Sequence, residues 1–216
     1  MIELLALETF ISRTSVKVKW GHDVSTLRER NRIRARNDIT AAALVLFAEQ
    51  GYDTTTVEQI ARAARLSSAT VFRHFPSKED ILFGDEDESA RTMVEYVAAR
   101  SDSSVDVAAL EEPIAKFAAE LQDERTQTLT RLVMTTRSLE ARSLRTRLLW
   151  EREIARQLAT EEGAATPTLR HTLVASLAVS CLSAALRYWD RFDPSSSLTD
   201  LVELAFQQRT SLDQSR

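Results

Sequence analysis

Residues 56–75 read Thr56-Val-Glu-Gln-Ile-Ala-Arg-Ala-Ala-Arg-Leu-Ser-Ser-Ala-Thr-Val-Phe-Arg-His-Phe75 and contain the signals of two short helices. Thr56 at a helix N-cap places Gln59 three residues later, which is the arrangement of a capping box and predicts a short helix. Ser67 or Ser68 caps a second short helix a few residues further on. Two short helices joined by a tight turn form a helix-turn-helix.

The side chains around this turn have the sizes that a helix-turn-helix requires. Ala61 is the small residue at which the second helix crosses the first, and apolar residues surround the joint. The second helix presents on its outer faces Ser67, Ser68, Ala69, Thr70, Phe72, Arg73 and His74. Short polar groups and donors of this kind suit base edges and phosphates in a DNA major groove.

The flanking segments extend this pair into a compact three-helix unit. A helix over 27–50 carries one apolar stripe, formed by Ile39, Ala43, Leu46 and Phe47. Gly51 follows it, where a left-handed residue ends a helix. After the second short helix, Ser77 caps another helix.

The remainder of the chain also predicts helices, so the expected fold class is all-α, with about nine helices. Only 4 glycines and 4 prolines occur in 216 residues, too few turn residues for a β architecture. Helices are expected near 78–101, 106–123, 125–138, 140–161, 168–191 and 197–213.

Composition and charge narrow the class of protein. One cysteine forms no internal disulfide, no secretory signal pattern opens the chain, and the longest apolar run, 173–186, is shorter than a membrane span. We therefore expect a cytoplasmic protein without a membrane partner. The net charge is −4, but residues 28–80 carry nine basic and seven acidic side chains, and arginines occupy every second position from Arg28 to Arg36. Clustered arginines favour phosphate binding.

The sequence around the turn resembles a known family. Residues 47–61, Phe47-Ala-Glu-Gln-Gly-Tyr-Asp-Thr-Thr-Thr-Val-Glu-Gln-Ile-Ala61, and residues 66–82, Leu66-Ser-Ser-Ala-Thr-Val-Phe-Arg-His-Phe-Pro-Ser-Lys-Glu-Asp-Ile-Leu82, resemble the DNA-binding domain of TetR-family transcriptional regulators. The resemblance covers about residues 34–82. It implies a dimer that reads a palindromic operator in double-stranded DNA. A helical effector-binding and dimerisation domain is expected to follow the DNA-binding domain.

The resemblance and the arginine run together define the expected DNA contacts. They are Arg28, Arg32, Arg36, Thr55, Thr56, Arg65, Ser67, Ser68, Thr70, Phe72, Arg73, His74 and Lys78. Two of these depart from the family pattern. Arg65 stands where the turn usually carries glycine, so either Arg65 is left-handed at a cost of about 1 kcal/mol, or the turn differs, or the guanidinium adds a DNA contact. Phe72 replaces the commoner tyrosine, so a hydroxyl-to-phosphate bond is lost.

The C-terminal part carries the expected effector and dimer surfaces. The candidate effector-pocket residues are Met93, Tyr96, Phe117, Leu121, Met134, Trp150 and Leu177. Few polar residues accompany them, which favours an apolar or amphipathic effector. In the resembling family the last two helices pair across the dimer axis, and the candidate dimer residues here are Ala175, Ala178, Leu182, Leu186, Leu201, Leu204 and Ala205.

Catalytic and metal chemistry find no support in the residue pattern. The three histidines are far apart and none has a ligand partner at metal-binding spacing, so we expect no metal and no cofactor. Cys181 lies among small apolar residues and is expected to be a buried hydrophobe. No paired acid and base or phosphate-binding glycine loop occurs, so an enzyme is not expected.

The expected organisation is a flexible extension over 1–25, a helix-turn-helix domain over 26–77 and an effector and dimerisation domain over 78–216. The sequence near Val24 resembles a natural chain start, so we expect translation to start there. An intact mass of full length for the protein made from its native gene would contradict this. The expected function is a repressor released from DNA by a small molecule. Two alternatives stay open: a DNA binder that needs no effector, and a ligand-binding protein or enzyme that has lost DNA recognition.

Overall fold

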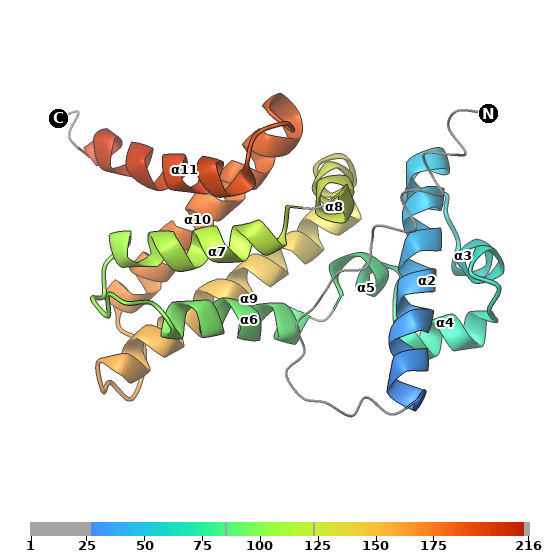
Figure 1. The fold of residues 1–216 in the computed structure, drawn as a ribbon, viewed down its shortest axis with the longest axis horizontal. Coiled ribbons are helices and arrows are strands. Elements are labelled where there is room, and N and C mark those ends of the chain that lie inside the picture. The colour runs from blue at the N-terminus through green and yellow to red at the C-terminus, as the bar shows by residue number, and fades with distance from the viewer. Residues whose placement is uncertain (1–26, 85, 123, 214–216) are drawn as a thin grey trace. The chain divides into compact units, whose positions relative to one another are not determined.

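The computed structural model describes residues 27–84, 86–122 and 124–213, and its described residues form helices and no strand. The predicted features of residues 1–25 lie outside this range. The chain divides into two compact units, with the boundary between Leu82 and Phe83. The first holds α2 to most of α5 and the second holds α6 to α11 (Figure 1). The all-α fold class is confirmed.

The first unit is a small helical domain built on α2 (Leu27–Gln50), α3 (Val57–Ala63), α4 (Ser68–His74) and α5 (Lys78–Phe83). Its core consists of Ile39, Ala43, Leu44, Phe47, Tyr52, Ile60, Ala61, Val71, Phe75, Ile81 and Leu82. The predicted stripe on α2 is correct except at one position. Leu46 is half-buried and Leu44 is buried in its place.

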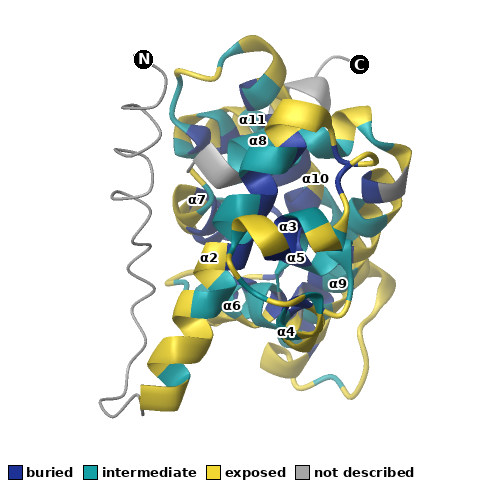
Figure 2. Ribbon diagram, turned by 90° about the vertical axis from the view of Figure 1, so that its right-hand side faces the viewer, coloured by how far each residue is buried: buried dark blue, intermediate teal, exposed yellow. Residues whose placement is uncertain are grey.

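The first half of α2 lies mostly outside this core. Most residues from Leu27 to Asp38 are exposed, as the yellow first turns of α2 in Figure 2 show. Charged side chains dominate this segment. The helix persists there because Arg, Glu and Ala are good helix formers.

The predicted helix over 78–101 is wrong, because it is two helices. α5 ends at Phe83, and α6 runs from Glu86 to Ala98. Gly84 between them has a φ of 69°, a left-handed conformation that ends α5 and that glycine adopts without strain. The expected boundary at 77/78 falls five residues before the observed one, because Ile81 and Leu82 are buried and α5 stays with the first unit.

The second unit is a bundle of long helices. After α6 come a 3₁₀ turn (Ala108–Leu110), α7 (Glu111–Glu120), α8 (Glu124–Thr135), α9 (Arg137–Glu161), α10 (Leu169–Phe192) and α11 (Leu198–Asp213). α7 packs on α6, α10 and α11, and α10 also packs on α8, α9 and α11. These two helices therefore form the centre of the unit.

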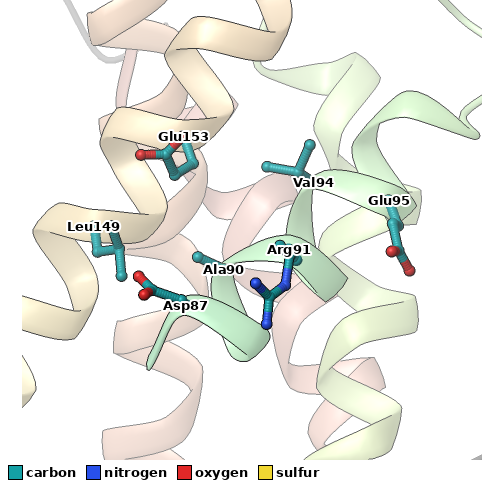
Figure 3. A pocket seen from close by; sticks show the side chains of 7 residues that line it. All are labelled: Asp87, Ala90, Arg91, Val94, Glu95, Leu149 and Glu153. Carbon is teal, nitrogen blue, oxygen red and sulfur yellow. The ribbon is translucent and has the colours of Figure 1, made fainter. Parts of the chain in front are cut away.

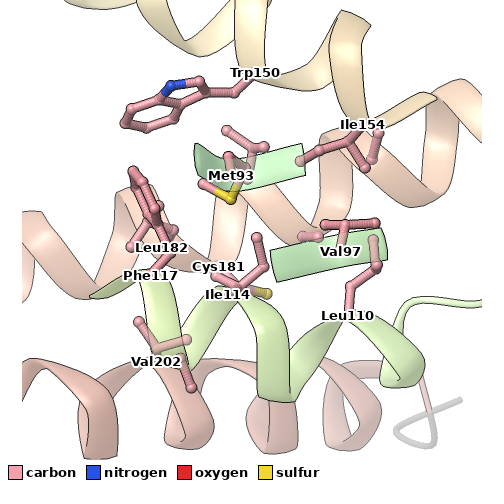
Figure 4. Packing of buried hydrophobic residues seen from close by; sticks show 14 of the residues in the cluster. Met93, Val97, Leu110, Ile114, Phe117, Trp150, Ile154, Cys181, Leu182 and Val202 are labelled. Carbon is pink, nitrogen blue, oxygen red and sulfur yellow. The ribbon is translucent and has the colours of Figure 1, made fainter. Parts of the chain in front are cut away.

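The core of the second unit is one continuous apolar cluster. Figure 4 shows Met93 and Val97 from α6, Phe117 from α7 and Trp150 from α9 meeting at its centre. The rings of Phe117 and Trp150 meet edge to face, with centroids 5.4 Å apart. Trp150 Nε1 donates a hydrogen bond to Ser89 Oγ at 3.1 Å, so the polar edge of this indole is satisfied.

α10 is the most apolar of the helices. Its length and composition would let it cross a membrane, although the run over 173–186 on its own is too short. Half of its 18-residue apolar stretch is buried inside the second unit, as expected for the core helix of a bundle.

Candidate nucleic-acid interface

The N-terminus of α3 is closed by the predicted capping box. Gln59 N–H donates to Thr56 Oγ1 at 3.2 Å, and Thr56 N–H donates to Gln59 Oε1 at 2.8 Å. Gln50 at the end of α2 donates to Gln59 Oε1 at 2.9 Å, so the cap is also tied to the preceding helix. Thr56 itself is exposed.

Thr55, which the sequence placed among the DNA contacts, has a different position. Its side chain is buried, and its hydroxyl donates to the carbonyl oxygen of Gly51 at 2.7 Å. A hydroxyl held inside the turn before α3 does not reach a phosphate. The predicted DNA contact by Thr55 is therefore wrong, and its side chain belongs to the turn.

The turn between α3 and α4 settles the first alternative for Arg65. Arg65 has a φ of 57°, and it is the one non-glycine residue with positive φ among the described residues. The turn has the hydrogen bonds of a Schellman motif: Leu66 N–H donates to Ala61 O at 2.8 Å, and Arg65 N–H donates to Arg62 O at 3.1 Å. Arg65 therefore adopts the glycine conformation, and its side chain is exposed.

α4 is the predicted second helix of the motif, and Ser67 is its N-cap. Thr70 N–H donates to Ser67 Oγ at 3.1 Å, and the two hydroxyls lie 2.9 Å apart. Val71 is buried on the inner face, whereas Phe72 is 48% exposed and Arg73 is exposed on the outer face. Ser68 and Thr70 are partly exposed. The outer face of α4 is thus polar and cationic around one exposed aromatic ring.

Cations gather at the C-terminal end of α4. The pKa of His74 lies below its usual value, first because of burial and then because of the nearby charges of Arg73, Arg36 and Arg32. Arg36 Nη1 donates to the carbonyl oxygen of His74 at 2.6 Å, and its guanidinium carbon lies 4.1 Å from the ring centre of Phe75. Sequence spacing gives no sign of this contact between α2 and α4, because Arg36 and His74 are 38 positions apart.

Two further predicted cations differ in how far they are held. Arg28 and Arg32 are both exposed, and Arg32 forms an ion pair with Glu29 one turn earlier, 2.7 Å between Nη2 and Oε1. Lys78 Nζ donates to the carbonyl oxygens of Tyr52 at 2.7 Å and Thr55 at 3.0 Å. Lys78 therefore fastens the start of α5 to the turn before α3.

The expected effector-pocket residues divide between core and surface. Met93, Phe117 and Trp150 are buried, and Tyr96, Leu121 and Leu177 pack against them at the edge of the cluster. Met134 lies apart from this group, because it is exposed on α8. Apart from Met134, the predicted pocket residues therefore belong to the packed core or its edge.

A groove lies elsewhere in the second unit, between α6 and α9. Its volume is about 410 Å³, and none of the predicted pocket residues lines it (Figure 3). The lining residues are Asp87, Ala90, Arg91, Val94, Glu95, Leu149 and Glu153. Three carboxylates against one guanidinium make the groove acidic. Sequence spacing alone gave no sign of it, because α6 was predicted as part of a longer helix.

Three of the predicted dimer residues face the interior of their own bundle. Ala175, Ala178 and Leu182 are buried in the core cluster, where they pack against the unit's own helices. Leu186, Leu201 and Ala205 are partly buried, and Leu204 is exposed. Ala175 and Ala178 are small residues on the buried face of α10, which packs against α7 and α9.

The described residues offer no group of three or more His, Cys, Asp or Glu side chains that could hold a metal ion. Cys181 is buried, and burial raises the pKa of its thiol. A buried neutral thiol is the inert form of the residue.

Comparison with known proteins finds matches for both the N-terminal and the C-terminal part of the chain. Residues 39–83 match the family described as bacterial regulatory proteins, tetR family, and residues 107–211 match the MftR C-terminal domain. The HTH-type transcriptional regulator TcmR of Streptomyces glaucescens is 51% identical over 55 residues, 26% of this chain and 24% of that protein. The chain therefore matches about a quarter of the length of this relative.

Two other proteins are similar over most of the chain. A Mycobacterium tuberculosis protein named as a mycofactocin biosynthesis transcriptional regulator, MftR, is 29% identical over 82% of this chain and 90% of its own length. The crystal structure of the transcriptional regulator FadR from Bacillus subtilis in complex with stearoyl-CoA superposes with a TM-score of 0.57, at 20% identity, over 79% of this chain and 95% of that chain. The fold and both halves of the sequence agree: the chain belongs to the TetR family of transcriptional regulators.

Proposed function

We propose that the chain is a sequence-specific DNA-binding repressor that acts in the cytoplasm and is released from its operator by a small molecule. The observation that carries the DNA-reading part is the outer face of α4. A short helix capped by Ser67 exposes Phe72 and Arg73 and partly exposes Thr70, with cations at its end. A helix with such a face fits the major groove, where guanidinium and hydroxyl groups read base edges.

Phosphate contacts would hold α4 in register. Arg28 and Arg32 are exposed on α2, and Thr56 is exposed at the start of α3. Lys78 uses two N–H groups on carbonyl oxygens of the described residues, which leaves one for a phosphate oxygen. Contacts of this kind are independent of sequence and weaken as salt rises.

A homodimer would present two copies of α4 to a palindrome. The buried Ala175, Ala178 and Leu182 are replaced in our proposal by the exposed stripe of α10 and its continuation on α11. The stripe consists of the exposed Leu169, Leu173, Ser180, Ala184, Tyr188, Phe192 and Leu204, together with the partly buried Leu177 and Leu201. Its spacing of three and four residues places these side chains on one face, and exposed apolar faces of this kind mark association surfaces.

The effector is proposed to be an apolar or amphipathic molecule that enters the bundle among α6, α7, α9 and α10. The apolar cluster around Phe117 and Trp150 supports this class, and FadR of Bacillus subtilis was crystallised with stearoyl-CoA. A strongly anionic head group is not expected in the α6–α9 groove, because Asp87, Glu95 and Glu153 line it. Effector binding would shift the population towards a dimer whose two α4 helices no longer match adjacent major grooves.

The test is binding of the purified protein to fragments of its own upstream region, repeated with fatty acids, acyl thioesters and aromatic compounds. We expect one palindromic fragment to bind tightly and to be released by one apolar or amphipathic compound class. Binding that no compound weakens would favour a regulator without an effector. Equal affinity for every fragment at every salt concentration would contradict the repressor and favour a ligand-binding protein.

A further inference from the structure

Arg36 differs from the other arginines of the α2 run in what its guanidinium contacts. It is half-buried, Nη1 donates to the carbonyl oxygen of His74 at 2.6 Å, and the guanidinium stacks on Phe75 at 4.1 Å. Arg28, Arg30 and Arg34 are exposed. Arg36 is thus held against the last residue of α4 and the residue that follows it.

The end of α4 has a need that Arg36 meets. α3 closes with a left-handed residue and the two hydrogen bonds of a Schellman motif, but α4 ends differently. Phe75 is extended, with φ −141° and ψ 107°, and Pro76 follows it. The last carbonyls of a helix need other donors in that case, and a cation at this end also matches the helix dipole. Arg36 supplies both to the carbonyl of His74.

We propose that Arg36 is a positioning residue that fixes the orientation of α4 against α2, and that it is not a phosphate ligand. This inference rests on the proposed DNA-reading function of α4. α4 has seven residues and one fully buried anchor, Val71, so one clamp at its C-terminal end controls its tilt. The His74 carbonyl takes up the Nη1 donor of Arg36, and the stack on Phe75 fixes the plane of the guanidinium.

The expected consequence separates Arg36 from an ordinary phosphate contact. Loss of a phosphate ligand weakens binding to every DNA sequence equally and lowers the salt slope. Loss of a positioning residue weakens binding to the operator, because base contacts need a fixed helix, and leaves non-specific affinity and the salt slope nearly unchanged.

The first arm of the test needs no DNA. Amide hydrogen exchange is measured on the free, full-length protein for wild type, Arg36→Lys, Arg36→Ala and the control Arg34→Ala, which removes the same charge from an exposed position. We expect exchange in the last turn of α4, including the Phe75 amide, to rise about tenfold in both Arg36 variants, because lysine cannot reproduce the planar stack and hydrogen bond. Unchanged exchange in Arg36→Ala would overturn the inference.

The second arm measures affinity for operator and random DNA over a salt series. We expect Arg36→Lys, which keeps the charge, to lose about tenfold in operator affinity and nothing on random DNA. Two results together would make Arg36 a phosphate ligand and overturn the inference. Arg36→Lys would behave like wild type, and Arg36→Ala would lose affinity equally on both DNAs, with a salt slope lowered by about 0.9. If wild type prefers no DNA sequence, the proposed function fails, and hydrogen exchange still decides whether Arg36 orders α4.

Discussion

Lys78 lies over the ring of Tyr52, with Nζ 4.0 Å from the ring centre and 2.7 Å from the Tyr52 carbonyl oxygen. The same ammonium reaches the carbonyl oxygen of Thr55 at 3.0 Å. The first residue of α5 therefore holds the turn that leads into α3. Because that turn carries the α3 cap, Lys78 joins stability and DNA binding in one side chain.

Lys78→Ala is expected to lower the free energy of unfolding by about 1–3 kcal/mol, since two charge-assisted hydrogen bonds and a cation–π contact are lost. It should also weaken binding to all DNA sequences and lower the salt slope by about one unit. Denaturant unfolding and a salt series of binding measure the two effects. Lys116→Ala, on the exposed face of α7, is the control, and equal results for the two variants would refute this role.

Arg65→Gly is expected to raise the free energy of unfolding by up to about 1 kcal/mol, because glycine adopts a φ of 57° without strain. Part of this gain is offset by the greater freedom of glycine in the unfolded chain. Arg65→Val should be destabilising, since β-branched residues avoid this region. A loss of stability in Arg65→Gly would contradict the account, and a fall in its DNA affinity would show that the Arg65 guanidinium contacts DNA.

The dimer proposal predicts that an acidic residue on the exposed stripe separates the protomers. Leu173 is 55% exposed and Leu204 is 44% exposed, so Leu173→Glu and Leu204→Glu should leave the monomer folded and shift sedimentation from dimer to monomer. Leu148→Glu on α9 is the matched control, because Leu148 is exposed outside the stripe. Loss of the dimer in the control alone would place the interface on α9.

The lowered pKa of His74 predicts a pH dependence of stability. Because the pKa in the folded state lies below the unfolded value of 6.5, the unfolded chain takes up the proton first as pH falls. The stabilisation of the folded state by neutral His74 is complete above the unfolded pKa and is lost as pH drops through the folded pKa. The melting temperature of wild type should therefore fall more than that of His74→Gln between about pH 7 and pH 5. Parallel curves for the two proteins would contradict this origin.

Local signals in the sequence predicted the helix-turn-helix closely. The capping box at Thr56, the serine caps before α4 and the apolar spacing are interactions between residues three or four apart, so a linear reading reaches them. The same reading missed the break at Gly84, because a single glycine in a helical pattern is compatible with both a helix and a helix end.

Contacts between elements far apart in the chain could not be predicted from local sequence patterns. The burial of Ala175, Ala178 and Leu182 in their own bundle depends on which face of α10 meets α7 and α9, and periodicity does not say which of two partners covers an apolar face. The same limit hid the contact of Arg36 with His74. The run of arginines suggested DNA contacts for Arg28, Arg32 and Arg36, although Arg36 is bound to the His74 carbonyl.

The proposed reading of base pairs by α4 is tested by Thr70→Ala. Affinity of wild type and Thr70→Ala is measured at several salt concentrations for the operator and for operators with each base pair changed. We expect the variant to lose discrimination at one or two positions, by about 1–3 kcal/mol each, with an unchanged salt slope. A uniform loss at all positions, or no preference for any sequence in wild type, would contradict it.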